Sequence, residues 1–163
     1  MTPAVQFREM SRSEYEAYMA WSYENYAGNL LRAGEASTPE AARETAKADL
    51  DWCLPQGRDT ASTWFLVLCT AEGQPIGLLC WQAHRERPDL AFLFDLWIEV
   101  PYRNRGYGQA AMRRLFAEAR ARGFARCGLN VFRYNDAGIH TYLKCGMTVT
   151  ETYEESLTME ISL

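Results

Sequence analysis

The sequence predicts a mixed α/β domain in which a mostly antiparallel sheet is combined with about four helices. Residues 11–54 contain two segments with helix-capping residues at their starts. From residue 63 onward, short apolar runs alternate with turn residues, which is typical of strands. Because 163 residues, 48% of them apolar, are enough to bury one core, we predict a single domain over residues 1–163.

The N-terminal third is predicted to be mainly helical. A short strand at residues 5–8 precedes the pattern Ser11-x-x-Glu14, which is a capping box at the start of a helix. We expect this helix to end near Gly28. A second helix is predicted over residues 38–54, because a threonine cap is followed there by a proline at the first helical position.

The rest of the chain is predicted to alternate between strands and helices. In chain order the expected elements are a hairpin of strands 63–70 and 75–83, a long strand 90–100, a loop and helix that end near Gly123, a strand 125–132, a short helix 135–146, and strands 147–153 and 156–163. The element order is therefore β-α-α-β-β-β-α-β-α-β-β.

Composition excludes several classes of function. A net charge of −4 argues against general nucleic-acid binding, which requires a basic face. No apolar run reaches the ~18 residues of a membrane span, and the N-terminus lacks a signal-peptide core, so we expect a soluble cytoplasmic protein without a membrane partner. The five cysteines form no C-x-x-C pair, which favours reduced thiols and no metal site.

The most informative segment is residues 96–123, which reads as a buried strand, a short loop and an amphipathic helix. The loop contains Gly106 and Gly108, which let an anion approach the main chain. The start of the following helix offers unpaired N–H groups and the positive end of a dipole. Arg103 and Arg105 add forked donors that suit phosphate oxygens. The segment therefore predicts a pyrophosphate site.

Three interpretations of this loop compete with that of a coenzyme A site. The P-loop pattern G-x-x-x-x-G-K-[ST] is absent. Gly106-x-Gly108-x-x-Ala111 matches the dinucleotide pattern G-x-G-x-x-A, but that fold places the motif in its first strand–helix unit and needs an acid about twenty residues later. The strand at 125–132 contains no acid. The loop could also be a glycine turn that only starts a helix.

The same residues resemble the GNAT superfamily of acetyl-CoA-dependent N-acyltransferases. The family's hallmark R/Q-x-x-G-x-G/A follows a long strand, and Arg103-x-x-Gly106-x-Gly108 matches it at each specified position. Upstream, FLFDLWIEVPYR is similar to the family's fourth strand; downstream, LNVFRYNDAGIHTYLKCGM is similar to its fifth strand and fourth helix. Asn135, Tyr142 and Gly146 stand at the family's positions. The resemblance, to an uncharacterised bacterial subgroup, covers residues 5–163.

The chain departs from the family pattern at a few positions. Many relatives carry a glutamate early in the fourth strand, and Phe92 and Phe94 occupy the corresponding places here. Gly138 and Met147 replace the usual alanine and phenylalanine.

The resemblance implies acetyl-CoA as co-substrate and no metal. Strands 92–100 and 125–132 would splay apart, and the pantetheine arm would lie in the gap, bonded to the backbone of Ile98 and Val100. The N–H of Ile98 would polarise the thioester carbonyl. Asn135 would bond the pantetheine, cap its helix, or do both. The residues that would hold the pyrophosphate are Arg103, Asn104, Arg105, Gly106, Tyr107, Gly108 and Gln109.

The implied reaction is direct attack of a neutral amine on the acetyl carbon. Tyr142 is the candidate acid for the departing thiolate, and the alternative is a tyrosine of the core. Strand alternation puts Asp95, Trp97 and Glu99 on one face, opposite Leu96 and Ile98. Asp95 is the first candidate for the base and Glu99 the second; either could instead be a solvated or paired carboxylate.

We therefore expect an N-acetyltransferase that acts on the primary amine of a small molecule or a protein. A CoA-sensing domain with little catalysis is the first alternative, because of the missing glutamate. A dinucleotide-dependent oxidoreductase is the second. Edge strands near the C-terminus also make a homodimer an open expectation.

Overall fold

A computed structural model describes residues 2–163, which fold as two units. The sheet unit contains the residues up to Glu9 and Trp64–Leu163, and the helical unit contains Met10–Thr63. The strands of the described chain are β1 (Val5–Glu9), β2 (Thr63–Thr70), β3 (Pro75–Ala83), β4 (Leu90–Ile98), β5 (Arg126–Phe132), β6 (Thr148–Thr152) and β7 (Ser156–Ser162). The helices are α1 (Arg12–Ala33), α2 (Pro39–Cys53), α3 (Tyr107–Ala121) and α4 (Asp136–Lys144).

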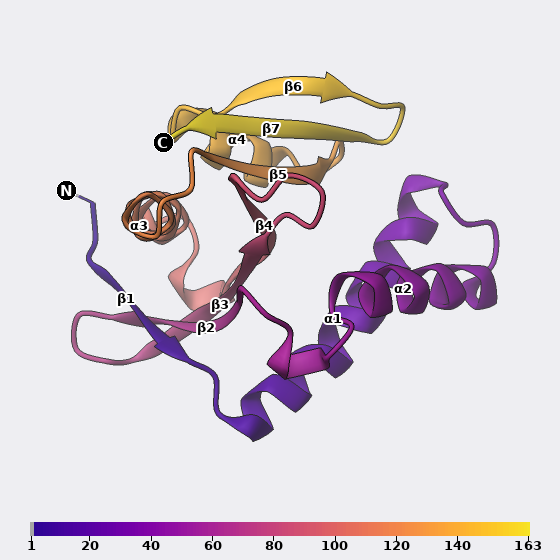
Figure 1. The fold of residues 1–163 in the computed structure, drawn as a ribbon, viewed down its shortest axis with the longest axis horizontal. Helices are drawn as coiled ribbons and strands as arrows, with labels where there is room; N and C mark the ends of the chain where they lie inside the picture. Colours follow the sequence, from indigo (N-terminus) through magenta and orange to yellow (C-terminus); the bar gives the residue numbers. More distant parts are fainter. Residues whose placement is uncertain (1) are drawn as a thin grey trace. The chain divides into compact units, whose positions relative to one another are not determined.

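The strands form one sheet in the order β1-β2-β3-β4-β5-β7-β6 (Figure 1). The pairs β1–β2, β3–β4, β5–β7 and β6–β7 are antiparallel, and β4–β5 is parallel. This confirms the predicted mixed α/β fold with a mostly antiparallel sheet. None of the helices within residues 2–163 is long and apolar enough to cross a membrane.

The helical unit consists of α1 packed on α2. The predicted capping box is present, since Ser11 and Glu14 exchange side-chain and backbone bonds of 3.2 and 2.7 Å. The predicted end near Gly28 is wrong: α1 continues to Ala33 and stops at Gly34, whose φ is 78°. The helix continues because Leu30, which is 2% exposed, packs with residues of α2 such as Ala42.

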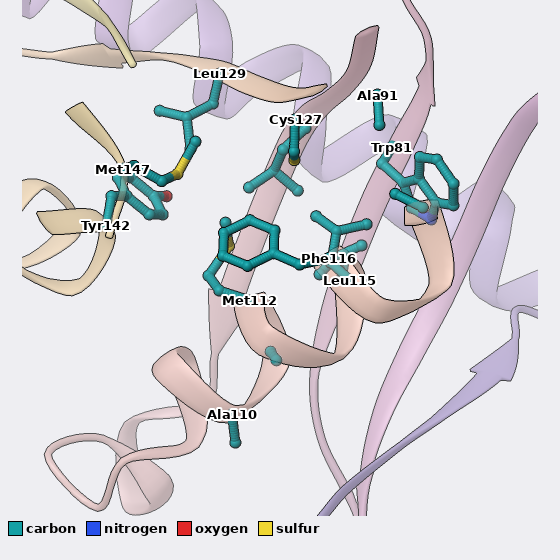
Figure 2. Close-up of a cluster of buried hydrophobic side chains, with 14 of the residues drawn as sticks. Trp81, Ala91, Ala110, Met112, Leu115, Phe116, Cys127, Leu129, Tyr142 and Met147 are labelled. Atoms are coloured by element: carbon teal, nitrogen blue, oxygen red, sulfur yellow. The ribbon is translucent and has the colours of Figure 1, made fainter. Parts of the chain in front are cut away.

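One face of the sheet packs against α3 and α4 and holds the main hydrophobic core (Figure 2). The inward face of α3 carries Met112, Leu115 and Phe116, which pack with Leu129 of β5. Tyr142 of α4 lies at one end of this core, beside Met147. The spacing that predicted an amphipathic helix after the glycine loop is therefore confirmed.

An ion-pair cluster ties the turn between β3 and β4 to the C-terminal strand. Glu160 accepts two bonds from Arg87, each of 3.0 Å, and a third from Arg126 of 2.9 Å. Its side chain is only 8% exposed. Hydrogen bonds from Arg87, opposed by partial burial and supported by Arg126, lower the pKa of Glu160 to about 2.

We predict that Glu160→Gln lowers the free energy of unfolding at pH 7 by roughly 1–3 kcal/mol, because both arginines lose a charged partner. The pKa of a glutamate in the unfolded chain is about 4.3, above the folded value, so the stabilisation is complete above that pH and is lost as the pH falls towards 2. Urea unfolding of both proteins from pH 7 to pH 2 measures the effect. The difference in unfolding free energy between the two proteins should begin to shrink below about pH 4 and should be small near pH 2.

The matched control is Glu151→Gln, because this exposed carboxylate makes no ion pair within the described residues and bonds the phenol of Tyr153. Its effect at pH 7 should stay within about 0.5 kcal/mol. Equal losses in the two variants, or a Glu160 effect that persists at pH 2, would contradict the assignment.

Candidate active site

A β-bulge in β4 determines which of its residues face the core. Cys80 of β3 pairs with Asp95, whereas the next residue, Trp81, pairs with Leu93, so Phe94 is an extra residue in β4. A bulge of this kind shifts the alternation of side chains by one position. Leu93 on one side of it and Leu96 on the other therefore point to the same face, and both belong to the core beneath α3 and α4.

The parallel pairing of β4 with β5 covers only the first half of the two strands. It runs from Leu90–Arg126 to Leu93–Leu129. β4 continues to Ile98 and β5 to Phe132, but over these residues of the described chain the two strands have no mutual register. The splay that the family resemblance implied is therefore present, and it begins after Leu93 and Leu129.

The hydrogen-bond pattern of β3 and β4 shows which amides face this gap. The N–H of Glu99 donates to the carbonyl of Ile76 over 2.8 Å. Because bonded and non-bonded pairs alternate in an antiparallel ladder, Trp97 is the next bonded residue in β4. The backbone groups of Leu96 and Ile98 consequently point away from β3 and toward β5. Sequence reasoning named Ile98 and missed Leu96, because the phase of the ladder cannot be read from side-chain types.

The predicted strand 90–100 is two residues too long. β4 ends at Ile98, and residues 100–102 form a 3-10 turn. Val100 is 66% exposed and its carbonyl accepts the N–H of Arg103 over 3.2 Å. Glu99 is exposed and stands between the strand and the turn. Pro101 accounts for the change, because proline cannot donate to a ladder and favours a turn.

The two arginines of the loop have different environments. The Nε of Arg103 donates to the carbonyl of Ile98 over 2.8 Å, and its guanidinium lies 4.4 Å from the ring centre of Trp97. Arg103 therefore holds the end of β4. Arg105 is exposed and makes no hydrogen bond or ion pair with any residue that the structure describes. Its guanidinium is available for a phosphate.

The start of α3 is built differently from the starts of the other helices. Ser11, Thr38 and Asn135 cap α1, α2 and α4 with side-chain oxygens. Within the described chain no side chain caps α3, which begins after Gly106 at a φ of 83°. Ala110 donates to the carbonyl of Gly106 over 3.0 Å, so the N–H groups before it have no helical acceptor.

The remaining residues of the predicted pyrophosphate loop lie in this turn. Asn104 also has a left-handed backbone, with a φ of 59°. Tyr107, Gly108 and Gln109 form the first turn of α3. A Cβ on Gly108 would lie 3.5 Å from a methyl group of Thr141 in α4, which is ordinary contact. The packing of α4 therefore does not require a glycine at position 108, and the lack of a Cβ there serves to leave the loop backbone open.

Tyr142 and Asp95 are the two titratable candidates that the fold brings together. Tyr142 is 8% exposed. Burial, followed by the charge of Asp95, raises the pKa of its phenol to about 12. Asp95 follows the bulge and faces away from Leu96, so the two groups approach the gap from opposite faces of the sheet. The prediction that Asp95 and Trp97 lie on the face of β4 opposite to Leu96 and Ile98 is confirmed.

The other candidates are mainly structural. Asn135 caps α4, and its Oδ1 accepts the N–H of Gly138 over 3.0 Å. A Cβ on Gly138 would lie 2.7 Å from the Asn135 amide, so the glycine allows this cap geometry. His140 is exposed. Burial raises the pKa of the Cys127 thiol to about 12, which leaves it protonated in the core and makes it a poor nucleophile.

The overall arrangement does not fit a dinucleotide-binding fold. That fold is a mostly parallel, doubly wound sheet with the glycine motif after its first strand. Here β4–β5 is the parallel pair among the described strands, and the motif follows β4.

Comparison with known proteins identifies relatives over most of the chain. Two uncharacterised N-acetyltransferases of Bacillus subtilis, YdgE and YycN, are each 28% identical over 148 residues, which is 90% of this chain and 94% of theirs. The crystal structure of YycN superimposes with a TM-score of 0.84 and covers 92% of this chain and 96% of its own.

A more distant structure shares the fold. The PaiA N-acetyltransferase of Thermoplasma acidophilum, solved with coenzyme A, is 21% identical with a TM-score of 0.68 and covers 98% of this chain and 99% of its own. Residues 12–147 match the acetyltransferase (GNAT) family as a whole. These relatives agree with the matched motif at the uncapped start of α3 and with the splayed strands. The chain therefore belongs to the acetyltransferase (GNAT) family and is an acyltransferase.

Proposed function

We propose that this protein transfers an acetyl group from acetyl-CoA to a primary amine by direct attack on the thioester. The observation that carries the proposal is the end of the β4–β5 ladder at Leu93–Leu129, beside the uncapped start of α3. The gap between β4 and β5 suits the peptide-like pantetheine arm of acetyl-CoA, and the start of α3 suits its diphosphate. Buried backbone groups without partners are rare, and the amides of pantetheine would satisfy those that face the gap.

The cofactor's diphosphate would bind the N–H groups at the start of α3. Tyr107, Gly108 and Gln109 present these groups, and the helix dipole favours an anion there. Arg105 would add a charge-assisted bond, whereas Arg103 is engaged by Ile98 and Trp97. Asn104 is proposed to supply backbone rather than side-chain contacts, because its left-handed conformation shapes the turn. Val100 is proposed to contact the cofactor at the mouth of the gap. Asn135 is proposed to contact the pantetheine.

The N–H groups of Leu96 and Ile98 are the proposed donors to the thioester carbonyl. Both point toward β5 in the part of β4 that β5 does not pair. A fixed N–H that meets the oxyanion of the transition state lowers the barrier by roughly 2.7–4 kcal/mol. This orientation is the reason for which we propose Leu96 beside Ile98 for this role.

Tyr142 is proposed to stabilise the departing thiolate by donating a hydrogen bond. Its pKa of about 12 lies above the value of about 8.5 for a free thiol, so full proton transfer would be uphill by roughly 4–5 kcal/mol. The phenol therefore stays protonated at all working pH values. A shared rather than transferred proton is the role that fits its burial.

Asp95 is proposed to accept the proton of the incoming ammonium, directly or through water, and Glu99 is the second candidate. An alkyl ammonium has a pKa near 10 and must lose a proton before it attacks. The amine nitrogen then bonds to the acetyl carbon, the C–S bond breaks, and the electron pair leaves on sulfur. The thiolate is finally protonated by solvent, and the products are the amide and CoA.

A CoA-binding sensor with little catalysis is the second candidate function. The phenyl rings of Phe92 and Phe94 lie 5.5 Å apart where many relatives carry a glutamate. This pair cannot accept a proton. The sensor and the enzyme differ in turnover, so one pair of measurements separates them.

The proposed function predicts that acetyl-CoA and CoA, but not NAD or ATP, raise the melting temperature. At a ligand concentration 100-fold above Kd the expected stabilisation is about 2.7 kcal/mol, or roughly 5–10 °C. Arg105→Ala should weaken acetyl-CoA binding about tenfold, because a charge-assisted bond is lost. Arg120→Ala, an exposed arginine near the other end of α3, is the matched control.

Release of free thiol in the presence of an amine panel completes the test. Acetyl-CoA stabilisation with thiol release supports the enzyme, and stabilisation without release supports the sensor. A larger shift with NAD than with acetyl-CoA, or equal effects of the two arginine variants, would count against the proposed cofactor site.

Tyr142→Phe should lower kcat by about 10²-fold while acetyl-CoA still raises the melting temperature, because only the hydrogen bond to the thiolate is lost. Steady-state thiol release measures the rate. Tyr23→Phe is the control, since that phenol donates to a backbone carbonyl of the helical unit, at Arg43. If kcat is unchanged in Tyr142→Phe, the residue is only a tyrosine of the core.

Asp95→Asn should lower the rate most at neutral pH and recover as the pH approaches the pKa of the acceptor amine, because a deprotonated amine needs no base. The pH dependence of kcat/KM from pH 6.5 to 10 tests this. Glu118→Gln on α3 provides the reference profile. A profile for Asp95→Asn that is parallel to the wild type would remove Asp95 from the mechanism.

A further inference from the structure

A cavity of about 380 Å³ opens in the sheet unit on the face away from α3 and α4. Phe92 of β4, Gly128 of β5 and Thr158 of β7 line it. These residues share one face, because Gly128 pairs with Phe92 and Asn130 pairs with Thr158, whereas their neighbours Leu129 and Met159 belong to the core.

The cavity lies where β4 and β5 begin to separate. Its floor includes Gly128 and Leu129, and Leu129 forms the last pair of the parallel ladder. Asn130, the next residue, lines the cavity beyond that pair. A Cβ on Gly128 would lie 3.1 Å from atoms of both Glu160 and Leu90, so the floor has no room for a side chain. Asp95 stands on the same face of β4, further along the strand.

Three carboxylates and one guanidinium line the cavity, and their pairing leaves it negative. Glu160 is bonded by Arg87 in the cavity wall and by Arg126 outside it. Glu86 and Glu151 form no ion pair with the described residues, although the charge of Glu151 also acts on Arg87 across the cavity. Glu151 accepts a hydrogen bond from the phenol of Tyr153, which leaves its charge in place.

An aromatic wall separates these charges from the gap. The ring of Phe92 meets the ring of Phe94 at 5.5 Å and that of His84 at 5.4 Å, edge to face in both cases. Nδ1 of His84 accepts the N–H groups of Glu86 and Arg87, each over 3.2 Å, which fixes the imidazole ring against the turn. An apolar wall with carboxylates at its far end suits methylene groups that end in a cation.

We infer that this cavity holds the acceptor, and that the acceptor is an aliphatic diamine. One nitrogen would reach the gap beside Asp95, the methylene chain would lie along Phe92, and the distal ammonium would sit between Glu86 and Glu151. The inference rests on the proposed function, because it assigns a substrate class to the same acetyl transfer. The reacting nitrogen loses a proton to the base and bonds to the acetyl carbon as the C–S bond breaks; the distal ammonium stays charged.

The test compares 1,5-diaminopentane with pentylamine and 5-aminopentanoate, which have the same chain but one or no net positive charge. With acetyl-CoA and the full-length protein, kcat/KM for the diamine should exceed that for pentylamine about tenfold, with 5-aminopentanoate lowest. In Glu86→Gln/Glu151→Gln the diamine-to-pentylamine ratio should fall to about two or less. Glu118→Gln, a carboxylate of α3 paired with Arg114, should keep the wild-type ratio.

Calorimetric titration of the CoA-bound protein with the same amines gives a readout that does not need turnover. Tighter binding of the diamine, lost in the double variant, supports the inference even if no thiol is released, and in that case the proposed acetyl transfer fails instead. Equal affinity for diamine and pentylamine, a ratio unchanged by the double variant, or a higher kcat/KM for a lysine-containing peptide than for the diamine would overturn the inference.

Discussion

The early end of the β4–β5 ladder is the constraint on which the rest of the site depends. A sheet normally pairs its backbone groups along the whole length of neighbouring strands, because a buried, unpaired N–H or C=O is costly. Here the pairing stops at Leu93–Leu129 although both strands continue. The end of β4 therefore carries backbone groups that β5 does not pair. The carbonyl of Ile98 accepts a hydrogen bond from Arg103, and the amides of the proposed cofactor would suit the groups that remain.

The bulge at Phe94 places the chemistry on the two sides of this gap. Without it, Asp95 would share the face of Leu93 and point into the core beneath α3 and α4. With it, Leu96 and Ile98 take the core face, and Asp95 faces the side on which Phe92 lines the cavity. The phenol of Tyr142 remains on the core side. A thioester in the gap would thus meet a hydrogen-bond donor from one face and a proton acceptor from the other.

The sequence was sufficient for features that depend on local signals. The capping box at Ser11, the proline-initiated second helix and the glycine-rich start of α3 follow from residues within one turn of each other, and the structure contains them. The end of α1, the phase of β4 after Phe94 and the ion pairs of Glu160 were not predictable in this way. Each depends on residues far apart in the chain. Leu30 packs against α2, Asp95 pairs with Cys80 of β3, and Glu160 forms an ion pair with Arg87.

The start of α3 shows how stability and binding trade against each other at one position. A serine, threonine or asparagine cap stabilises a helix by about 1 kcal/mol, and α1, α2 and α4 have such caps. α3 has Gly106 there instead, in a left-handed conformation that a side-chain-bearing residue would adopt at a cost. A capping oxygen would occupy the N–H groups that a diphosphate needs. The missing cap is therefore a local loss of stability that a bound anion would recover, and binding of the proposed cofactor there would stabilise α3 directly.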